Sequence, residues 1–321
     1  MEAKVSAENK MLLKSDKKLS FSEKLKKEWK KNYFIYLILL PVVLYYILFH
    51  YAPMYGIIIA WKKFIPTKGI WGSPWVGWAN FISFFKSYYF ARLIKNTFII
   101  SFYGLIFGFP APIIFALMLN EVKDGAFKKI TQTITYLPHF ISVVIICGIL
   151  TDFLAPDGAI NTILSVFGVE SKAWLQEAGS FRSIFIGSDI WQSIGWSSIM
   201  YLAALANVNT ELYDAAYMDG ANRWQRMTNV TIPGILPTII IMFILRLGHL
   251  LSVGAEKIIL LYNPNTYVTA DVISTFVYRR GLLEADYSFT TAIGLFNSVI
   301  NFIFLIAANF LSRKTSETSL W

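Results

Sequence analysis

The sequence predicts an all-α membrane protein with six transmembrane helices. Of its 321 residues, 55% are hydrophobic and only 15% are charged, and the mean hydropathy is +0.51. A soluble domain carries about 25% charged residues, so this chain has too few to cover a surface in water. The apolar residues fall in continuous runs, whereas the strands of a membrane barrel alternate. Because backbone groups in lipid must bond within their own segment, such runs predict helices.

The formal charge of +9 is concentrated at the N-terminus. Residues 1–32 contain ten lysines and five acidic residues. No stripe of arginine and lysine with interleaved aromatic residues follows, which argues against nucleic-acid binding. We expect a basic cytoplasmic tail that contacts anionic membrane lipids, and a solvated tail without such contacts is the alternative.

Six stretches are long and apolar enough to cross a membrane. The first, 33–60, contains no charged residue. It is too long for the core of a cleavable signal peptide, so we expect it to stay attached. The other five stretches cover about 96–120, 130–154, 183–206, 236–262 and 289–311.

Six spans place both termini on one side of the membrane, and the lysine-rich tail makes that side cytoplasmic. Without the tail, the charge bias between the two sides would reverse, so this orientation depends on the first span. The expected parts are the basic tail 1–32, the first helix 33–60, an extracellular aromatic-rich loop 61–91, a five-helix core 92–312 that includes a cytoplasmic loop 207–235, and a cytoplasmic tail 313–321.

The most informative segment lies between the fourth and fifth spans. It reads ELYDAAYMDGANRWQRMTNVTIPGILP from Glu211 to Pro237. We expect a short helix over 211–219, ended by Gly220 in a left-handed conformation, and a second short helix over 221–229. Pro233 and Pro237 would then open the fifth span, since proline is tolerated in a first helical turn. Small residues and mixed charges suit docking into a groove of another protein.

This segment resembles the EAA loop of ABC-importer permeases. The family pattern is Glu-Ala-Ala, three residues, Gly, nine residues, Ile, one residue and Leu-Pro. Asp214 stands in place of the Glu, and Val230 and Ile232 replace the Ile and the Leu, so charge and apolar character are kept. The resemblance implies a loop that couples to an ATPase through Asp214, Ala215, Ala216, Asp219, Gly220, Ala221, Arg223 and Pro233.

Four other segments extend the resemblance over nearly the whole chain. They are similar to the LplB-type permeases of the carbohydrate-uptake class, which implies the type I ABC importer permease fold in the bacterial plasma membrane. The implied partners are a second homologous permease, a pair of ATP-binding subunits, an extracellular substrate-binding protein and an oligosaccharide substrate. The four segments are PVVLYYILFHYAPMYGIIIAWKKFIP from Pro41, GIWGSPWVGWANF from Gly69, EKIILLYNPNTY from Glu256 and ADVISTFVYRRGL from Ala270.

The chain contains no G-x-x-x-x-G-K-[ST] phosphate-binding loop. We therefore expect no catalytic residue and no cofactor in this chain, with ATP and Mg²⁺ bound by the partner ATPase. Three scattered histidines and one cysteine offer neither an enzyme site nor a metal site. The alternative function is an ion-coupled secondary transporter, although the two halves show no inverted symmetry.

Polar residues inside membrane spans are costly and are therefore candidates for the substrate path. Arg246 and His249 lie three residues apart on one helical face, and Glu256 lies on nearly the same face. The alternative places Glu256 and Lys257 near the outer interface, which we expect for Lys257. The alternative for Arg246 is an ion pair with an acid of the partner permease.

Two further groups of positions could line the path. Asp189, Gln192 and Trp196 share one helical face, and sugars bind to planar polar groups and aromatic rings; helix capping and lipid contact are the alternative. Asn297 and Asn301 could instead bond neighbouring helices. The complete set of candidates is Asp189, Gln192, Trp196, Arg246, His249, Asn297 and Asn301.

Overall fold

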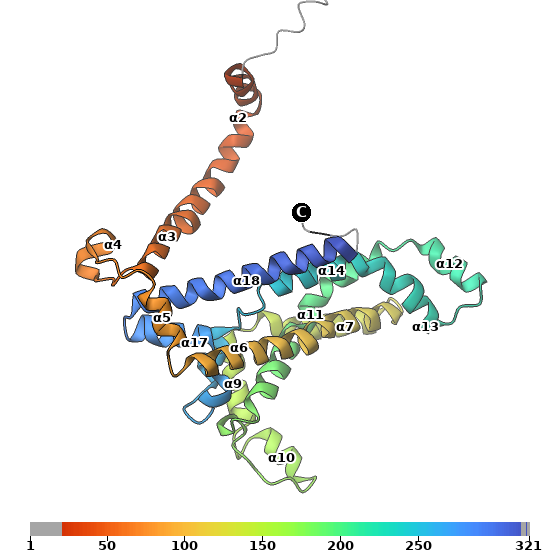
Figure 1. Cartoon of the computed structure of the whole chain (residues 1–321). Helices are drawn as coiled ribbons and strands as arrows, with labels where there is room; N and C mark the ends of the chain where they lie inside the picture. The colour runs from red at the N-terminus through yellow and green to blue at the C-terminus, as the bar shows by residue number, and fades with distance from the viewer. Residues whose placement is uncertain (1–20, 316–318, 320–321) are drawn as a thin grey trace, which may run out of the picture. The chain divides into compact units, whose positions relative to one another are not determined.

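The computed structural model describes residues 21–315 and 319, and within them the chain is helical, without β-strands (Figure 1). The chain divides into two units, Met1–Ile58 and Ile59–Trp321. The first twenty residues of the expected tail lie outside the described residues, as do positions 316–318 and 320–321 of the C-terminal tail.

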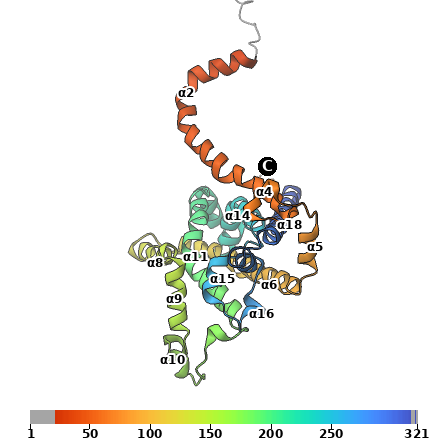
Figure 2. The same ribbon diagram turned by 90° about the vertical axis from the view of Figure 1, so that its left-hand side faces the viewer.

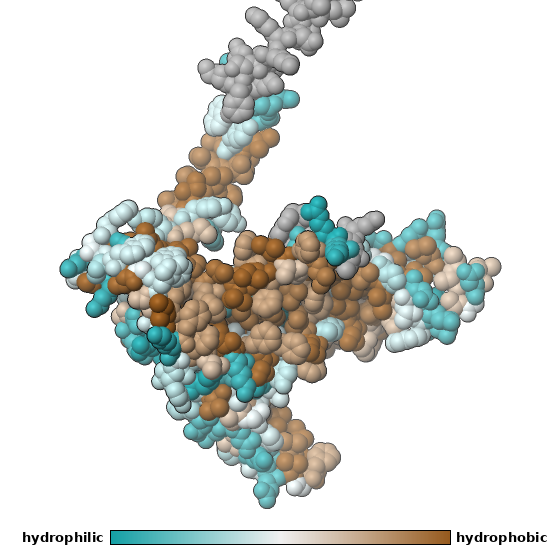
Figure 3. Space-filling model, in the orientation of Figure 1, coloured by the Kyte–Doolittle hydropathy of each residue, from teal (hydrophilic) through white to brown (hydrophobic). Residues whose placement is uncertain are grey.

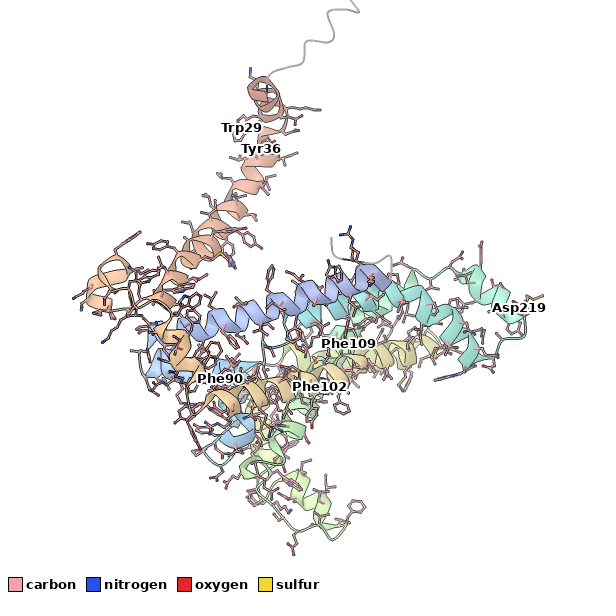
Figure 4. All side chains as sticks on the ribbon, viewed as in Figure 1. Trp29, Tyr36, Phe90, Phe102, Phe109 and Asp219 are labelled. Atoms are coloured by element: carbon pink, nitrogen blue, oxygen red, sulfur yellow. The ribbon has the colours of Figure 1, made fainter. Side chains whose placement is uncertain are left out.

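The first unit is one long helix with two irregularities. Helix α2 (Phe21–Tyr46) contains Asn32 with non-helical backbone angles, and it continues through a π turn, Ile47–Tyr51, into α3 (Ala52–Met54). Across Asn32, the ring of Trp29 stacks on that of Tyr36 with centroids 5.0 Å apart (Figure 4). The apolar stretch from Glu28 to Trp61 is long enough to cross a membrane.

Three long helical segments of the second unit are also long and apolar enough to span. The first joins α6 (Phe90–Tyr103) to α7 (Pro110–Glu121) through a π turn, Gly104–Gly108. The second joins α13 (Arg223–Arg226) to α14 (Ile232–Gly248) through another π turn, and the third is α18 (Tyr287–Thr315).

In each of three long helices, a π turn precedes one proline. Pro53, Pro110 and Pro233 each stand two residues after the end of a π turn. Proline has no N–H and its ring clashes with the carbonyl four residues earlier, so a wider turn lets the helix continue past it.

The expected third span, 130–154, is bent. Helix α8 (Ala126–Tyr136) continues as a 3₁₀ turn to Phe140, and α9 (Val143–Phe153) leaves it at an angle of 101°. Pro138 lies in the turn, and Ser142 Oγ caps α9 by accepting a hydrogen bond from Val144 N. This bent pair raises the number of possible spans from four to five.

The fifth span differs more strongly from the expected 236–262. The helix begins at Arg223, ends at Gly248, and is followed by a break before α15 (Ala255–Leu261). Pro233 therefore lies inside a continuous helix rather than at its opening. Helix α11 (Phe181–Ala206) has the length of a span but is not among those that are apolar enough, so six spans remain a prediction.

Helix α11 organises the packing of the second unit. It packs against α7, α8 and α14, and the turned view places α8 and α9 on one side of it and α14 and α18 on the other (Figure 2). A Cβ atom on Gly195 would lie 2.2 Å from the carbonyl oxygen of Thr135, so the two backbones are in direct contact there. Apolar side chains cover the flanks of the long helices, and polar ones gather around the loop that carries α12 and α13 (Figure 3).

A buried carboxylate ties together the end of the unit that lies away from this loop. Asp271 is 0% exposed and receives hydrogen bonds from Arg92 at 3.2 Å, Arg279 at 2.8 Å and Thr275 at 2.8 Å. Burial disfavours the charged guanidinium of Arg279, but the hydrogen bond and the negative charge of Asp271, together with the contact to Tyr262, outweigh this effect and raise the pKa of Arg279.

The same cluster reaches α11 through Asn96. Its side-chain nitrogen donates to the backbone oxygens of Val268 and Asp271, and its Oδ1 accepts a hydrogen bond from Arg182 of α11 at 2.8 Å. We call Arg92, Asn96, Arg182, Asp271 and Arg279 the Asp271 network. It joins α6, α11 and the segment that precedes α17 (Ile273–Tyr278).

We predict that Asp271→Asn lowers the free energy of unfolding by about 3–5 kcal/mol, because two partly buried arginines lose their counter-ion. Thermal denaturation of the purified protein in detergent measures the effect. Glu284→Gln is the matched control, since it breaks the exposed pair with Arg280 and should cost less than about 1 kcal/mol. Equal losses from the two changes would contradict this role of Asp271.

Candidate functional site

A cavity of about 170 Å³ lies among α6, α11, α14, α15 and the break before α15. Its polar lining comes from Ser101, Asp189, Arg246, His249, Ser252 and Lys257. We call it the polar cavity. A second cavity of about 220 Å³ is lined by Ser193, Ser197 and Tyr201, and again by Asp189 and Arg246. Asp189 and Arg246 thus face both cavities, and the polar surface runs along α11 and α14.

Lys257 has an unusual environment in the polar cavity. Its side chain is 6% exposed, and its Nζ makes no hydrogen bond to the described residues. The carboxylate of Asp189 lies 3.9 Å away, beyond hydrogen-bond distance, and the ring of Phe185 lies beneath the ammonium group at 5.7 Å. Ser101 Oγ is also buried without a hydrogen-bond partner. Two buried donors of this cavity are therefore unsatisfied.

Arg246 lies near the C-terminal end of α14 with its guanidinium against Gly104. A Cβ atom on Gly104 would lie 3.3 Å from Nη2 of Arg246, so this glycine leaves room for the group. Within the described residues, no hydrogen bond or ion pair engages the guanidinium of Arg246, whose backbone oxygen accepts a hydrogen bond from His249 N. His249 follows as the C-cap of α14 and lines the same cavity.

The helix break that follows is held by Asn301 of α18. Its Oδ1 accepts a hydrogen bond from Leu251 N at 2.9 Å, and its Nδ2 donates to Ser252 Oγ at 3.2 Å. Asn301 and Asn297 line neither cavity. Asn301 thus bonds a neighbouring segment, and the break turns α15 so that Lys257 lines the cavity rather than the outer interface.

The predicted face of α11 is not brought together in one place. Asp189 lines both cavities, but Gln192 and Trp196 line neither. The indole of Trp196 stacks on His139, with centroids 4.6 Å apart and planes 4° apart, and remains 44% exposed. Sequence reasoning also missed Ser101 and placed Lys257 elsewhere. Hydrophobic periodicity could not reveal the break before α15, because Asn301, which holds it, is distant in the sequence.

The loop between α11 and α14 begins with α12 (Thr210–Met218), which Asn209 caps. Gly220 has φ +78°, as the sequence predicted. Ala221 N donates to Ala216 O at 2.9 Å and Gly220 N to Tyr217 O at 3.0 Å. These two bonds form a Schellman motif, which ends the helix with a glycine in the left-handed region.

The second half of the loop differs from the expected helix 221–229. A capping box formed by Asn222 and Gln225 starts α13 at Arg223, and the helix then continues without interruption to Gly248. The loop is anchored to this helix by a hydrogen bond from Tyr213 to Thr231 at 3.0 Å, and Arg226 lies over the ring of Tyr217.

The tip of the loop is exposed. Asp219 lies at its far end (Figure 4), next to Met218, whose side chain is 83% exposed. The backbone bonds at Gly220 and the capping box fix the shape of this tip. Of the predicted coupling residues, Ala216 and Ala221 are half-buried, while the other loop residues, Asp214, Ala215, Asp219, Gly220 and Arg223, are exposed.

Comparisons with known proteins identify the family. The binding-protein-dependent transport system inner membrane component family matches residues 108–317. The chain belongs to this family. It is 41% identical to "Protein LplB" of Bacillus subtilis over 91% of this chain and 92% of that protein. It is 38% identical to the "Polygalacturonan/rhamnogalacturonan transport system permease protein YteP" of the same species, over 100% and 99% of the two chains.

A solved structure also matches this permease. It belongs to a bacterial ABC transporter involved in the import of the acidic polysaccharide alginate, with 46% identity and a TM-score of 0.85 over 91% of this chain and 99% of that one. The predicted all-α fold of a type I ABC importer permease is therefore confirmed. Nothing in these comparisons supports the ion-coupled alternative.

We predict that Asn301→Leu loosens the helix break, because Leu251 N loses its buried acceptor at a cost of about 1–3 kcal/mol. Hydrogen exchange measured by mass spectrometry should become faster over residues 249–254. Ser298→Ala is the control, since that exposed hydroxyl bonds only to its own helix at Gly294 O. Unchanged exchange in Asn301→Leu would contradict this support of the break.

Proposed function

We propose that this permease forms half of the translocation pathway of an ATP-driven importer for oligosaccharides. The relatives named for polygalacturonan, rhamnogalacturonan and alginate support a substrate derived from a polysaccharide. Its partners would be a second homologous permease, a pair of ATP-binding subunits and an extracellular substrate-binding protein, which the family description supports. ATP and Mg²⁺ would bind to the ATP-binding subunits, because this chain contains no phosphate-binding loop.

The observation that carries the mechanism is the continuous helix Arg223–Gly248. Its first turns belong to the exposed loop, and Arg246 near its last turn lines both cavities. At 1.5 Å per residue, 26 residues cover about 39 Å. A displacement of the loop by a partner would therefore move the wall of the substrate path directly.

In this mechanism the ATPase contacts the loop through Asp214, Ala215, Ala216, Asp219, Gly220, Ala221 and Arg223. Pro233 lies in the helix that transmits the movement. Closure of the ATPase dimer on ATP would shift the loop and favour an outward-open path, and hydrolysis would reset it. This is a two-state element that ligands at distant sites bias. The loop and both termini would lie on the cytoplasmic side.

Asp189, Arg246 and His249 are the predicted lining residues that reach a cavity, and we propose that they contact substrate. Gln192, Trp196 and Asn297 would line the path only where the second permease completes it, and Asn301 would act through the break that it holds.

We predict that Gly220→Trp, or Asp214→Lys, abolishes uptake and substrate-stimulated ATP hydrolysis while membrane insertion survives. The bulky or charge-reversed tip would no longer fit its partner. Uptake and ATPase assays on the reconstituted transporter measure the effect.

Gly168→Trp is the matched control, because Gly168 has φ +77° and open space around it, like Gly220, but lies in a different loop, between α10 (Ala159–Ser165) and α11. Both substitutions carry the same backbone strain. Unimpaired uptake in the Gly220 and Asp214 variants, or equal loss in Gly168→Trp, would contradict the coupling role.

A further inference from the structure

The polar cavity contains many hydrogen-bond donors and few acceptors. Lys257 and Arg246 can only donate, Ser101 supplies a further buried hydroxyl, and the hydroxyl oxygen of Ser252 already accepts a hydrogen bond from Asn301. Asp189 is the one carboxylate in the lining, alongside His249. A site built for neutral sugar hydroxyls, which donate and accept, would need a more even set of partners.

The two buried donors lack hydrogen-bond partners among the described residues. An ammonium group that is 6% exposed is costly without hydrogen bonds, and Asp189, which forms a long ion pair with it at 3.9 Å, accepts none from it. Ser101 Oγ is unsatisfied in the same cavity. A ligand that supplies acceptor oxygens here would satisfy both groups.

Asp189 is an incomplete counter-ion for this site. Its side chain is 48% exposed, so it retains water, and it faces both cavities. Arg246 adds a second cation, held against Gly104, and within the described part of the chain its guanidinium forms no ion pair, although Asp189 lines the same two cavities. The charged side chains of the lining therefore comprise two cations and one anion, which leaves one positive charge for a ligand to neutralise.

We infer that the polar cavity binds a carboxylate, so that this permease selects oligosaccharides of uronic acids over neutral ones. Arg246 presents a planar fork of donors that matches the two oxygens of a carboxylate, and Lys257 adds a compact ammonium group on the α15 side. The inference rests on the proposed function and names the substrate class of the same path.

In this arrangement Asp189 weakens the binding of a substrate carboxylate. It competes with a substrate carboxylate for Lys257, which keeps binding weak enough for the substrate to leave toward the second cavity. A path for neutral sugars would instead use Asp189 as an acceptor for hydroxyl groups. The two possibilities therefore predict opposite effects when the carboxylate of Asp189 is removed.

The test uses the complete transporter with its second permease and ATPase, purified together in lipid nanodiscs without the binding protein. Tetragalacturonate is compared with the same tetramer after reduction of its carboxyl groups to neutral alcohols. Equilibrium binding is measured for the unmodified complex and for Arg246→Met, Lys257→Met and Asp189→Asn. Lys172→Met is the control, because this half-exposed lysine is paired with Glu177 and lines neither cavity.

We expect the unmodified complex to bind the acidic tetramer about tenfold or more tightly than the reduced one. Arg246→Met and Lys257→Met should each remove about tenfold of the affinity for the acidic tetramer and leave the reduced tetramer unchanged. Asp189→Asn should strengthen binding of the acidic tetramer, and Lys172→Met should change neither.

The inference would be overturned if the complex bound the two tetramers equally well. If that complex still hydrolysed ATP when the binding protein was added, the proposed function would remain intact. Weaker binding of the acidic tetramer in Asp189→Asn would also overturn the inference. Loss of the second permease from the Arg246→Met complex would assign Arg246 to subunit pairing and overturn its role here. Failure of the unmodified chain to co-purify with any ATPase would overturn both proposals.

Discussion

The buried carboxylate of Asp271 is the constraint on which the arrangement of the helices depends. Its pairs with Arg92 and Arg279, and the contact of Asn96 with Arg182, fix α6, α11 and α17 to one another. The cavity walls come from the same helices, α6 and α11, further along. Arginine pairs suit such a place, since the guanidinium stays charged and can bond several groups at once. The Asp271 network thus sets the spacing of α6 and α11, which form walls of the polar cavity. Inside that cavity, the donors Lys257 Nζ and Ser101 Oγ remain without hydrogen-bond partners among the described residues.

The two ends of the helix Arg223–Gly248 are fixed in different ways. One end is shaped by local bonds, the Schellman motif at Gly220 and the capping box at Asn222, so the loop tip does not depend on distant packing. The other end stops at Gly248, where Asn301 holds the break from outside. A rigid rod with a fixed tip and a defined end can transmit a displacement, whereas a flexible loop would absorb it. The cavity lies where the rod ends, which is where a small movement changes the lining most.

The sequence predicted features that depend on neighbouring residues along the chain. The left-handed Gly220 and the short helix before it follow from local composition, and Asp189 and Arg246 follow from the cost of charge in a span. Features that depend on distant residues were missed or misplaced. Asn301 lies about fifty positions from the break that it holds, and Lys257 reaches the cavity only because of that break. Periodicity assigned Gln192 and Trp196 to one face with Asp189, but it could not show that the bent pair α8 and α9 brings His139 against Trp196.

The π turn at Met227–Thr231 has a consequence for the rotational phase of its helix. A wider turn holds about one residue more than an α-helical turn, so every later side chain is rotated by about 100° relative to an uninterrupted helix. The π turn therefore changes the direction in which Arg246 points, around the helix axis, relative to the loop residues before the turn. A variant in which the loss of Pro233 restored a regular helix would present a different set of side chains to the cavity from an almost unchanged sequence. The lining of the cavity could in this way diverge through a single backbone irregularity, far from the residues that form that lining.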